Sequence, residues 1–220
     1  GLSVEDADAL MGRPMGIPKT GVFGLYDLIG IDLMVDVVKS LNNILPNGDA
    51  FHAVGKENKT ITSMIKNGFT GNKGRGGFYK TGPDGLSHTL QLVGHKGGNL
   101  PPYAAAKKEL PELAIKAAAA LAQNKEPLTK IIEGNSNHAK FCRRVLGRVL
   151  SYAASLLPTV TETPQDIDDA MKLGFNWQRG PFELIDAIGH SKMKELLKEA
   201  GVKTPDALQL DQPFYKVDGS

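Results

Sequence analysis

A ten-residue phrase occurs twice in this chain of 220 residues, so any fold must accommodate two similar pieces. Residues 21–30 read GVFGLYDLIG and residues 180–189 read GPFELIDAIG, with six identical letters. Upstream, SVEDADALM at residues 3–11 parallels TPQDIDDAM at residues 163–171. Downstream, both pieces close with FYK, at 78–80 and at 214–216. Because the order of the parts agrees from end to end, we expect two related structural units, here called the first and second copy.

Helix-end signals occur at matching places in the two copies. Ser3 and Thr163 are predicted N-caps, and an aspartate three residues later suggests a capping box in each copy. Gly30 and Gly189 are predicted to end the helices of the repeated phrase. Apolar residues at helical spacing predict further helices over 33–45 and 192–200. Further N-caps are predicted at Asp32, Thr60, Ser191 and Thr204.

The second copy contains a long helical pattern that the first copy lacks. Residues 137–158 carry apolar side chains at the spacing of a buried helix face. These are Phe141, Val145, Leu146, Val149, Leu150, Ala153 and Leu157. Only Gly1 and Leu2 precede Ser3 in the first copy. We therefore expect this chain to be a fragment of a longer protein that supplies the matching helix.

The remaining segments predict a mostly α protein with small β excursions. The alanine-rich run 103–127 predicts a connecting helix interrupted near Pro111. Residues 78–93 predict a hairpin around a Gly-Pro-Asp-Gly turn. The expected domains are a first helical repeat over residues 1–100, a connecting segment over 101–136, and a second helical repeat over 137–220.

Composition excludes several classes of protein. Hydrophobic residues make up 41% of the chain and the net charge is +2, so neither a nucleic acid nor an acidic membrane surface is an expected partner. No apolar run approaches the roughly 18–20 residues that a membrane-spanning helix needs. The single cysteine, Cys142, cannot form a disulfide within the chain. We therefore expect a reducing compartment, either a bacterial cytoplasm or an organelle matrix.

Three groups of residues have a chemical and a structural interpretation. The glycine-rich stretch 68–80, with Lys73 and Arg75, could cradle a phosphate or form a tight turn, and the turn is favoured because no phosphate-loop motif fits. Arg143, Arg144 and Arg148 could meet an acidic partner or form a solvated basic face, which is the favoured interpretation. The histidines lack metal-ligand spacing and are expected at the surface. They are His52, His88, His95, His138 and His190.

The pattern DIDDAMKLGFNWQRGPFELIDAIG, at residues 166–189, resembles the C-terminal helical domain of 3-hydroxyacyl-CoA dehydrogenases. The first copy resembles it through PMG at 14–16, GVFGLYDLIGID at 21–32 and the turn ending GRGGFYK. Multifunctional members of that family carry this domain twice. The resemblance implies two tandem helical domains of the type found at the C-terminus of 6-phosphogluconate dehydrogenase.

The resemblance also implies an activity for the full-length protein. Family members are NAD-dependent enzymes of fatty-acid β-oxidation that convert (3S)-3-hydroxyacyl-CoA to 3-oxoacyl-CoA. The NAD-binding Rossmann domain and the catalytic residues are then expected upstream of residue 1, and no catalytic, cofactor-binding or metal-binding residue within the chain. The family's catalytic asparagine corresponds in the second copy to Arg144, so this fragment is expected to be inactive alone.

The expected role of the fragment is to cover the acyl-CoA cleft and to mediate association. Pro14, Met15 and Phe23 are expected on the substrate side, although Gly24 stands where the family has glutamate. Expected partners are the acyl-CoA substrate, the missing Rossmann domain, an enoyl-CoA hydratase domain in the same chain, and a second subunit in a homodimer. The residues alone leave two alternatives open: a non-catalytic helical adaptor, or direct binding of CoA or nucleic acid by the arginine face and the glycine loop.

Overall fold

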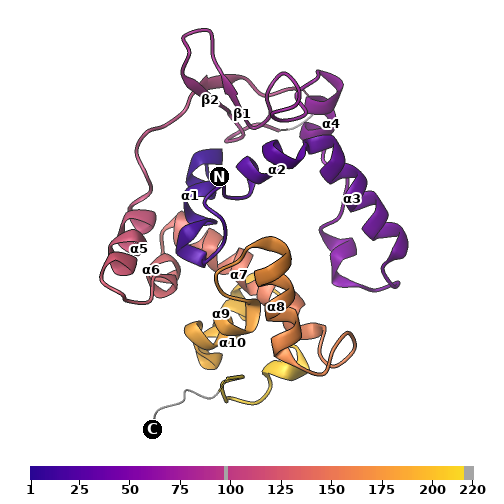
Figure 1. The fold of residues 1–220 in the computed structure, drawn as a ribbon, viewed down its shortest axis with the longest axis vertical. Helices are drawn as coiled ribbons and strands as arrows, with labels where there is room; N and C mark the ends of the chain where they lie inside the picture. Colours follow the sequence, from indigo (N-terminus) through magenta and orange to yellow (C-terminus); the bar gives the residue numbers. More distant parts are fainter. Residues whose placement is uncertain (97–98, 216–220) are drawn as a thin grey trace. The chain divides into compact units, whose positions relative to one another are not determined.

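The computed structural model describes residues 1–96 and 99–215, and it divides the chain into two compact units. The first unit comprises residues 1–9 and 20–110, and the second comprises 10–19 and 111–220. Both are built mainly of helices (Figure 1), which confirms the predicted fold class. The domain boundaries that we expect at residues 100 and 136 stay predictions, and the end of the second copy, 216–220, lies outside the described residues.

The first unit combines short helices with a small sheet. Its helices are α1 (Val4–Leu10, which runs one residue into the second unit), α2 (Phe23–Ile29), α3 (Ile31–Ile44), the 3-10 turn η2 (Ala50–Ala53) and α4 (Lys59–Lys66). Its strands are β1 (Tyr79–Thr81), β2 (Ser87–Leu90) and β3 (Tyr103–Ala105). The sheet has the order β1-β2-β3, and both pairs are antiparallel. Tyr79 faces Thr89 across the first pair, so the predicted hairpin is confirmed.

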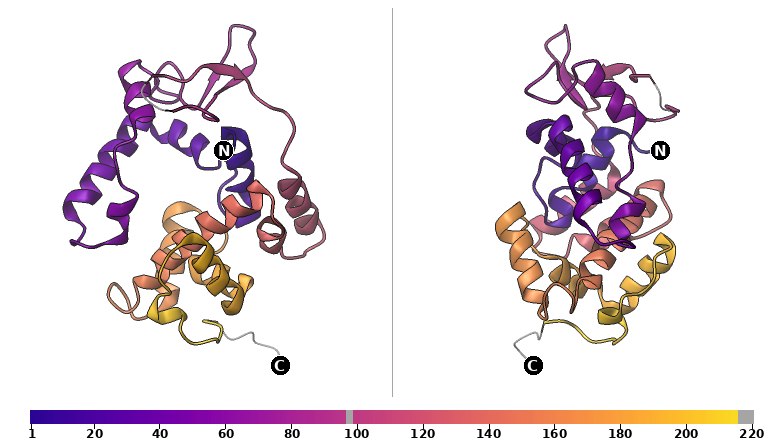
Figure 2. Two further views of the ribbon diagram at one scale, coloured as in Figure 1. Left: turned by 180° about the vertical axis from the view of Figure 1, so that it is seen from behind. Right: turned by 90° about the vertical axis from the view of Figure 1, so that its right-hand side faces the viewer.

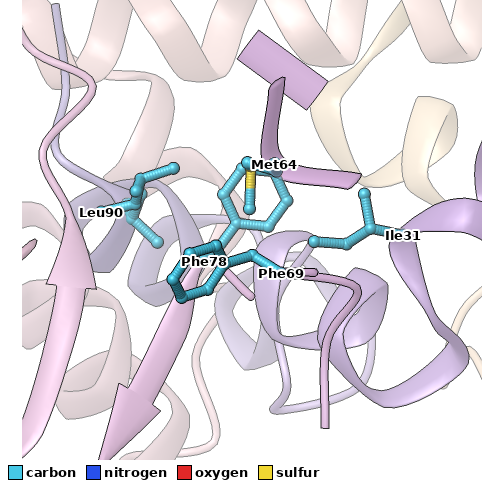
Figure 3. Close-up of a cluster of buried hydrophobic side chains, with 6 residues drawn as sticks. Ile31, Met64, Phe69, Phe78 and Leu90 are labelled. Atoms are coloured by element: carbon cyan, nitrogen blue, oxygen red, sulfur yellow. The ribbon is translucent and has the colours of Figure 1, made fainter. Parts of the chain in front are cut away.

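One apolar cluster forms the core of the first unit (Figure 3). Its buried members come from helices, the glycine-rich turn and the sheet, and they are Val4, Ile31, Met64, Phe69, Phe78 and Leu90. The rings of Phe23 and Phe78 lie 4.6 Å apart between centroids. The cluster joins the start of α3 to β1 and β2, so it fixes the position of the glycine-rich turn between them.

The second unit is a helical bundle. Its elements are η1 (Arg13–Met15), α5 (Glu112–Ala122), α6 (Leu128–Ile132), α7 (Asn137–Ser155), α8 (Pro164–Phe175), α9 (Pro181–Ile188), α10 (His190–Ala200) and η3 (Asp206–Leu208). The helix α7 packs against both α9 and α10, as Figures 1 and 2 show from three sides. Ser136 caps α7 by accepting a bond from the Ala139 N–H, at 3.1 Å.

Several predicted helix ends are confirmed. The hydroxyls of Ser3 and Thr163 accept hydrogen bonds from the N–H groups three residues later, at 3.2 and 3.4 Å. Gly30 and Gly189 end α2 and α9 with positive φ angles of 111° and 85°. These angles favour glycine, so a larger residue at either position would be strained.

Four predicted caps are wrong for a local reason. The helices α3 and α10 begin directly after Gly30 and Gly189, so Asp32 and Ser191 lie inside them rather than before them. Asn58 caps α4 in place of Thr60, because its side-chain oxygen accepts from the Thr60 N–H at 2.9 Å. Thr204 gives no cap to η3, which follows Pro205 without a side-chain bond.

The alanine-rich connection also contains less helix than predicted. Tyr103–Ala105 pairs with β2 as a third strand, and helix begins only at Glu112, after Pro111. The Tyr103 ring packs on Phe69 at 5.3 Å, and its hydroxyl donates to the Gly77 carbonyl. Tertiary contacts therefore override the helix propensity of the two alanines.

Among the described residues, no helix combines the length and apolar character needed to span a bilayer.

Candidate functional site

A buried aspartate organises the second unit. Asp168 of α8 is fully buried, and its carboxylate accepts hydrogen bonds from the Phe182 N–H at 2.8 Å and the Glu183 N–H at 3.0 Å. These N–H groups open α9 and have no partner within that helix, so Asp168 caps α9 from a neighbouring helix. The Tyr215 hydroxyl donates a third bond to the same carboxylate, at 2.8 Å.

A second aspartate completes this arrangement. Asp186 of α9 accepts bonds from the Phe214 N–H at 3.0 Å and the Tyr215 N–H at 2.9 Å. The segment that carries Tyr215 is thus held by α9 and returns its hydroxyl to Asp168. The ring of His190 lies 3.2 Å from Asp186 through Nε2 and 5.0 Å from the Phe214 ring centroid. Three segments are therefore closed into one network around two carboxylates.

The same set of bonds recurs in the first unit. Asp8 accepts from the Phe23 N–H at 2.7 Å, the Gly24 N–H at 2.9 Å and the Tyr79 hydroxyl at 2.9 Å. Asp27 accepts from the N–H groups of Phe78 and Tyr79, both at 2.8 Å. The repeated letters of the sequence are therefore the residues of this network. The sequence patterns did not predict these hydrogen bonds. The available signal was that the same aspartate and tyrosine residues stand at matching positions of the two copies.

The two networks differ in the charges around them. In the second unit the Lys172 ammonium lies 2.7 Å from Glu183, and His190 lies beside Asp186. In the first unit Gly24 and Ile31 occupy the positions of Glu183 and His190. Burial, with a smaller contribution from the charge of Asp8, raises the pKa of Asp27 to about 6 against the lowering effect of the two N–H bonds.

The chemistry of both networks is structural. Desolvation also raises the pKa of the Asp8 and Asp168 carboxyl groups, in each case against the donated bonds. Desolvation, followed by the nearby aspartates, raises the pKa of the Tyr79 and Tyr215 hydroxyls. Each carboxylate is occupied by two or three donors from its own unit. The networks therefore hold helix ends and chain segments in place rather than leaving a base ready for a substrate.

The helices α2 and α3 expose an apolar surface, here called the α2–α3 face. Leu25, Ile29 and Val37 are 36%, 40% and 41% exposed, and Tyr26, Met34, Val38 and Leu41 are only half-buried. At an offset of 159 residues, the second unit has apolar residues on α9 and α10. These are Leu184, Ile185, Ile188, Met193, Leu196, Leu197 and Ala200, all buried. The helix α7 packs over them, and an exposed apolar patch of this kind indicates an interaction surface.

The structure places the three predicted substrate-side residues in different surroundings. Pro14 and Met15 are buried in η1 of the second unit, which packs against α5 and α6. The next residue, Gly16, accepts a backbone bond from the Gln178 N–H at 2.7 Å. Phe23 is half-buried at the start of α2 in the first unit. Their substrate-side role stays a prediction.

The glycine-rich turn does not fit a phosphate or a dinucleotide. Such a cradle needs free backbone N–H groups. Here the N–H of Asn72 donates to the Asp27 carbonyl and that of Gly71 to the Gly76 carbonyl, at 2.8 and 2.9 Å. A Cβ at Gly77 would lie 1.8 Å from the Asp27 carboxylate. The glycines therefore let the turn close around Asp27, and the predicted tight turn is confirmed.

Two expectations about charged residues need correction. Arg143 is only 8% exposed, and its guanidinium binds Glu199 and the carbonyl groups of Ile132 and Gly134. It is therefore part of the bundle, whereas Arg144 and Arg148 are exposed as predicted. His190 is 7% exposed and lies in the second network rather than at the surface. Cys142 is buried, and desolvation raises its pKa to about 12, so its thiol is inert.

No group of histidine, cysteine, aspartate and glutamate side chains in residues 1–96 and 99–215 has the arrangement of a metal site.

Comparison with known families gives a clear match. The sequence model of the family described as 3-hydroxyacyl-CoA dehydrogenase, C-terminal domain, matches residues 1–81 and 141–216, which is well over half of the chain. Each matched range contains one of the two aspartate networks.

Known proteins match along nearly all of the chain. A Rickettsia prowazekii protein, provisionally named a fatty acid oxidation complex trifunctional enzyme, is 30% identical over 97% of this chain and 27% of its own length. A Bacillus subtilis protein, provisionally named a 3-hydroxyacyl-CoA dehydrogenase, is 27% identical over 93% of this chain and 25% of its own length. The chain thus spans about a quarter of these relatives. No solved structure gives a significant match.

Proposed function

This chain belongs to the 3-hydroxyacyl-CoA dehydrogenase family through its C-terminal domain, and we propose that it is the tandem helical part of an enzyme of fatty-acid β-oxidation. The complete enzyme oxidises (3S)-3-hydroxyacyl-CoA to 3-oxoacyl-CoA and reduces NAD. The observation that carries this proposal is the family match at both aspartate networks. The name of the Rickettsia relative, which refers to fatty acid oxidation, supports the pathway.

The cofactor is bound outside these 220 residues. The glycine-rich turn uses its N–H groups internally, so it does not fit NAD. A Rossmann domain elsewhere in the complete protein holds NAD and brings the catalytic residues. Because relatives are about four times as long as the chain, there is room for that domain and for an enoyl-CoA hydratase domain.

The helices contribute by covering the acyl-CoA cleft and by associating with other domains or subunits, including those of a homodimer. Pro14, Met15 and Phe23 lie on the substrate side in this proposal. The uncovered α2–α3 face supports the association role, because exposed apolar side chains are stabilised when a partner removes them from water. The compartment is a bacterial cytoplasm or an organelle matrix.

The test compares this chain with the complete natural protein that contains it. NADH formation is measured with a series of (3S)-3-hydroxyacyl-CoA substrates of increasing chain length. The complete protein is expected to turn over at least one of them, and the isolated chain none. Turnover by the isolated chain would disprove its proposed inactivity. Absence of turnover by the complete, folded and NAD-binding protein would disprove the proposed activity.

The uncovered α2–α3 face also favours a second candidate, a helical adaptor without chemistry. An adaptor predicts that the complete protein neither binds NAD nor oxidises any of the substrates, but still associates through α2 and α3. Titration calorimetry of the complete protein with NAD separates the two candidates, since only the dehydrogenase gives binding heat.

A further inference from the structure

The pair asparagine-glycine occurs twice in the chain, at Asn47-Gly48 and at Asn67-Gly68. In such a pair the backbone nitrogen of the glycine can attack the side-chain amide carbon of the asparagine, and glycine allows the necessary rotation because it has no Cβ. The reaction needs no enzyme and no cofactor. It does need an asparagine side chain and a glycine N–H that are free to move, so the folded structure decides which pair reacts.

The first pair lies in the turn between α3 and η2, and both of its residues are exposed. Among the described residues, neither the Asn47 amide nor the Gly48 N–H makes a hydrogen bond. A Cβ at Gly48, whose φ angle is 92°, would meet no atom within 4 Å, so there is open space beside this peptide. A backbone bond crosses the turn from the Asp49 N–H to the Pro46 carbonyl, at 3.1 Å, but it involves neither reacting group.

The second pair is held by hydrogen bonds at the end of α4, although Asn67 is exposed as well. The Asn67 amide donates to the Ser63 carbonyl at 2.8 Å. The Gly68 N–H donates to the Ile65 carbonyl at 2.9 Å, and the Gly68 carbonyl accepts from the Arg75 N–H at 3.0 Å. Both reacting groups would therefore have to give up a hydrogen bond before the attack begins.

From this contrast we infer that Asn47 is a site of spontaneous deamidation in the folded chain and that Asn67 is protected. The Gly48 nitrogen gives its proton to water and forms a bond to Cγ of Asn47, while the amide nitrogen takes up a proton and leaves as ammonia. Water then opens the resulting cyclic imide at either carbonyl. One opening leaves aspartate, and the other leaves isoaspartate, in which the backbone continues through the side chain.

The reaction changes the charge and the backbone just beyond the end of α3. Either product places a carboxylate shortly after Ile44, where a negative charge is unfavourable because it lies near the C-terminus of a helix. Isoaspartate also lengthens the backbone between Pro46 and Asp49, which closes the turn and caps η2 by accepting from the Phe51 N–H at 2.7 Å. The modified chain is therefore more acidic and less firmly held in this turn. The inference is independent of the activity proposed above.

Ageing of the purified chain tests the inference. The folded chain is kept in mildly alkaline buffer at physiological temperature, and the peptides that contain each pair are followed by mass spectrometry, in which deamidation replaces NH₂ by OH. We expect Asn47 to react at least about tenfold faster than Asn67, because the second pair reacts only after local opening. Fragmentation of the peptides assigns the site and distinguishes isoaspartate from aspartate.

The unfolded chain and two variants complete the test. In urea both pairs are free, so their rates are expected to agree within about twofold. Asn47→Ser is expected to abolish the fast deamidation of the folded chain, and Asn67→Ser to preserve it, with circular dichroism as the check that both variants are folded. Equal rates in the folded chain, or faster reaction at Asn67, would overturn the inference. A tenfold preference for Asn47 that persists in urea would also overturn it, because the neighbouring sequence rather than the fold would then explain it.

Discussion

Asp168 and Asp169 are neighbours in α8 with opposite surroundings. Asp168 is fully buried and accepts three hydrogen bonds, whereas the Asp169 side chain is 46% exposed and pairs with Lys172. We expect Asp168→Asn to lower the free energy of unfolding by about 2–4 kcal/mol, because the amide cannot accept all three bonds and buries an unpaired NH₂ group. Asp169→Asn is expected to cost less than about 1 kcal/mol. Urea unfolding of both variants measures the difference, and equal losses would contradict the capping role.

Asp27 gives the first unit an unusual dependence on pH. Its folded pKa of about 6 lies above the ordinary aspartate pKa of 3.8, so its contribution to stability is fully present below about pH 3.8 and is lost as pH rises through 6. Between pH 5 and 7 the native chain is expected to lose about 1 kcal/mol more stability than Asp27→Asn. Unfolding curves of both proteins across this range give the difference. Identical pH profiles would show that the carboxyl group does not titrate there.

At the scale of elements, the close packing of α8 and α9 depends on the absence of a side chain at Gly180. A Cβ at this position would lie 2.2 Å from Cγ of Asp168, whereas one at Gly174 would meet no atom within 4 Å. We expect Gly180→Ala to destabilise the chain by about 2–3 kcal/mol through overpacking. Gly174→Ala is expected to stabilise it by about 0.5 kcal/mol through helix propensity. Thermal unfolding distinguishes the two, since the midpoints should move in opposite directions.

Elements that depend on local chemistry were predictable from the sequence. Gly30 and Gly189 end their helices as expected, and the long helix predicted over 137–158 is observed as Asn137–Ser155. Elements that depend on distant contacts were not predictable. Tyr103–Ala105 is a strand because β2 offers it backbone partners, and no local signal marks that pairing.

The candidate site follows the same division. The repeat places Asp8 and Asp168, and likewise Tyr79 and Tyr215, at matching positions of the two copies. It does not predict that each tyrosine bonds to its aspartate, because the two partners lie far apart in the sequence. His190 is predicted at the surface because its spacing from Asp186 matches no metal-binding or catalytic motif, whereas the structure places the two side chains in contact. The sequence predicts that the first copy lacks the long helix of the second, but it does not predict which face is exposed as a result, because the packing of α7 against α9 and α10 is a tertiary contact.

At the scale of the whole molecule, the chain contains two related helical units, and the second has less apolar residues at two positions where the first exposes leucine. It has Ala187 and Lys192 where the first has exposed Leu28 and Leu33. Leu28→Ala combined with Leu33→Lys therefore transfers the solvated residues to the first unit. Because both leucines are exposed, the free energy of unfolding of the double variant is expected to lie within about 0.5 kcal/mol of that of the native chain.

The same double variant is expected to reduce self-association, since it removes two exposed apolar side chains of α2 and α3 beside the α2–α3 face. Sedimentation velocity at increasing concentration should show a rising sedimentation coefficient for the native chain and a constant one for the variant. Leu173→Lys is the matched control, because Leu173 is 88% exposed on α8, outside the α2–α3 face, and its replacement should leave the association unchanged. If the control also abolished association, general solubility rather than this face would govern the behaviour of the chain. A native chain that stays monomeric at all concentrations would contradict the predicted self-association.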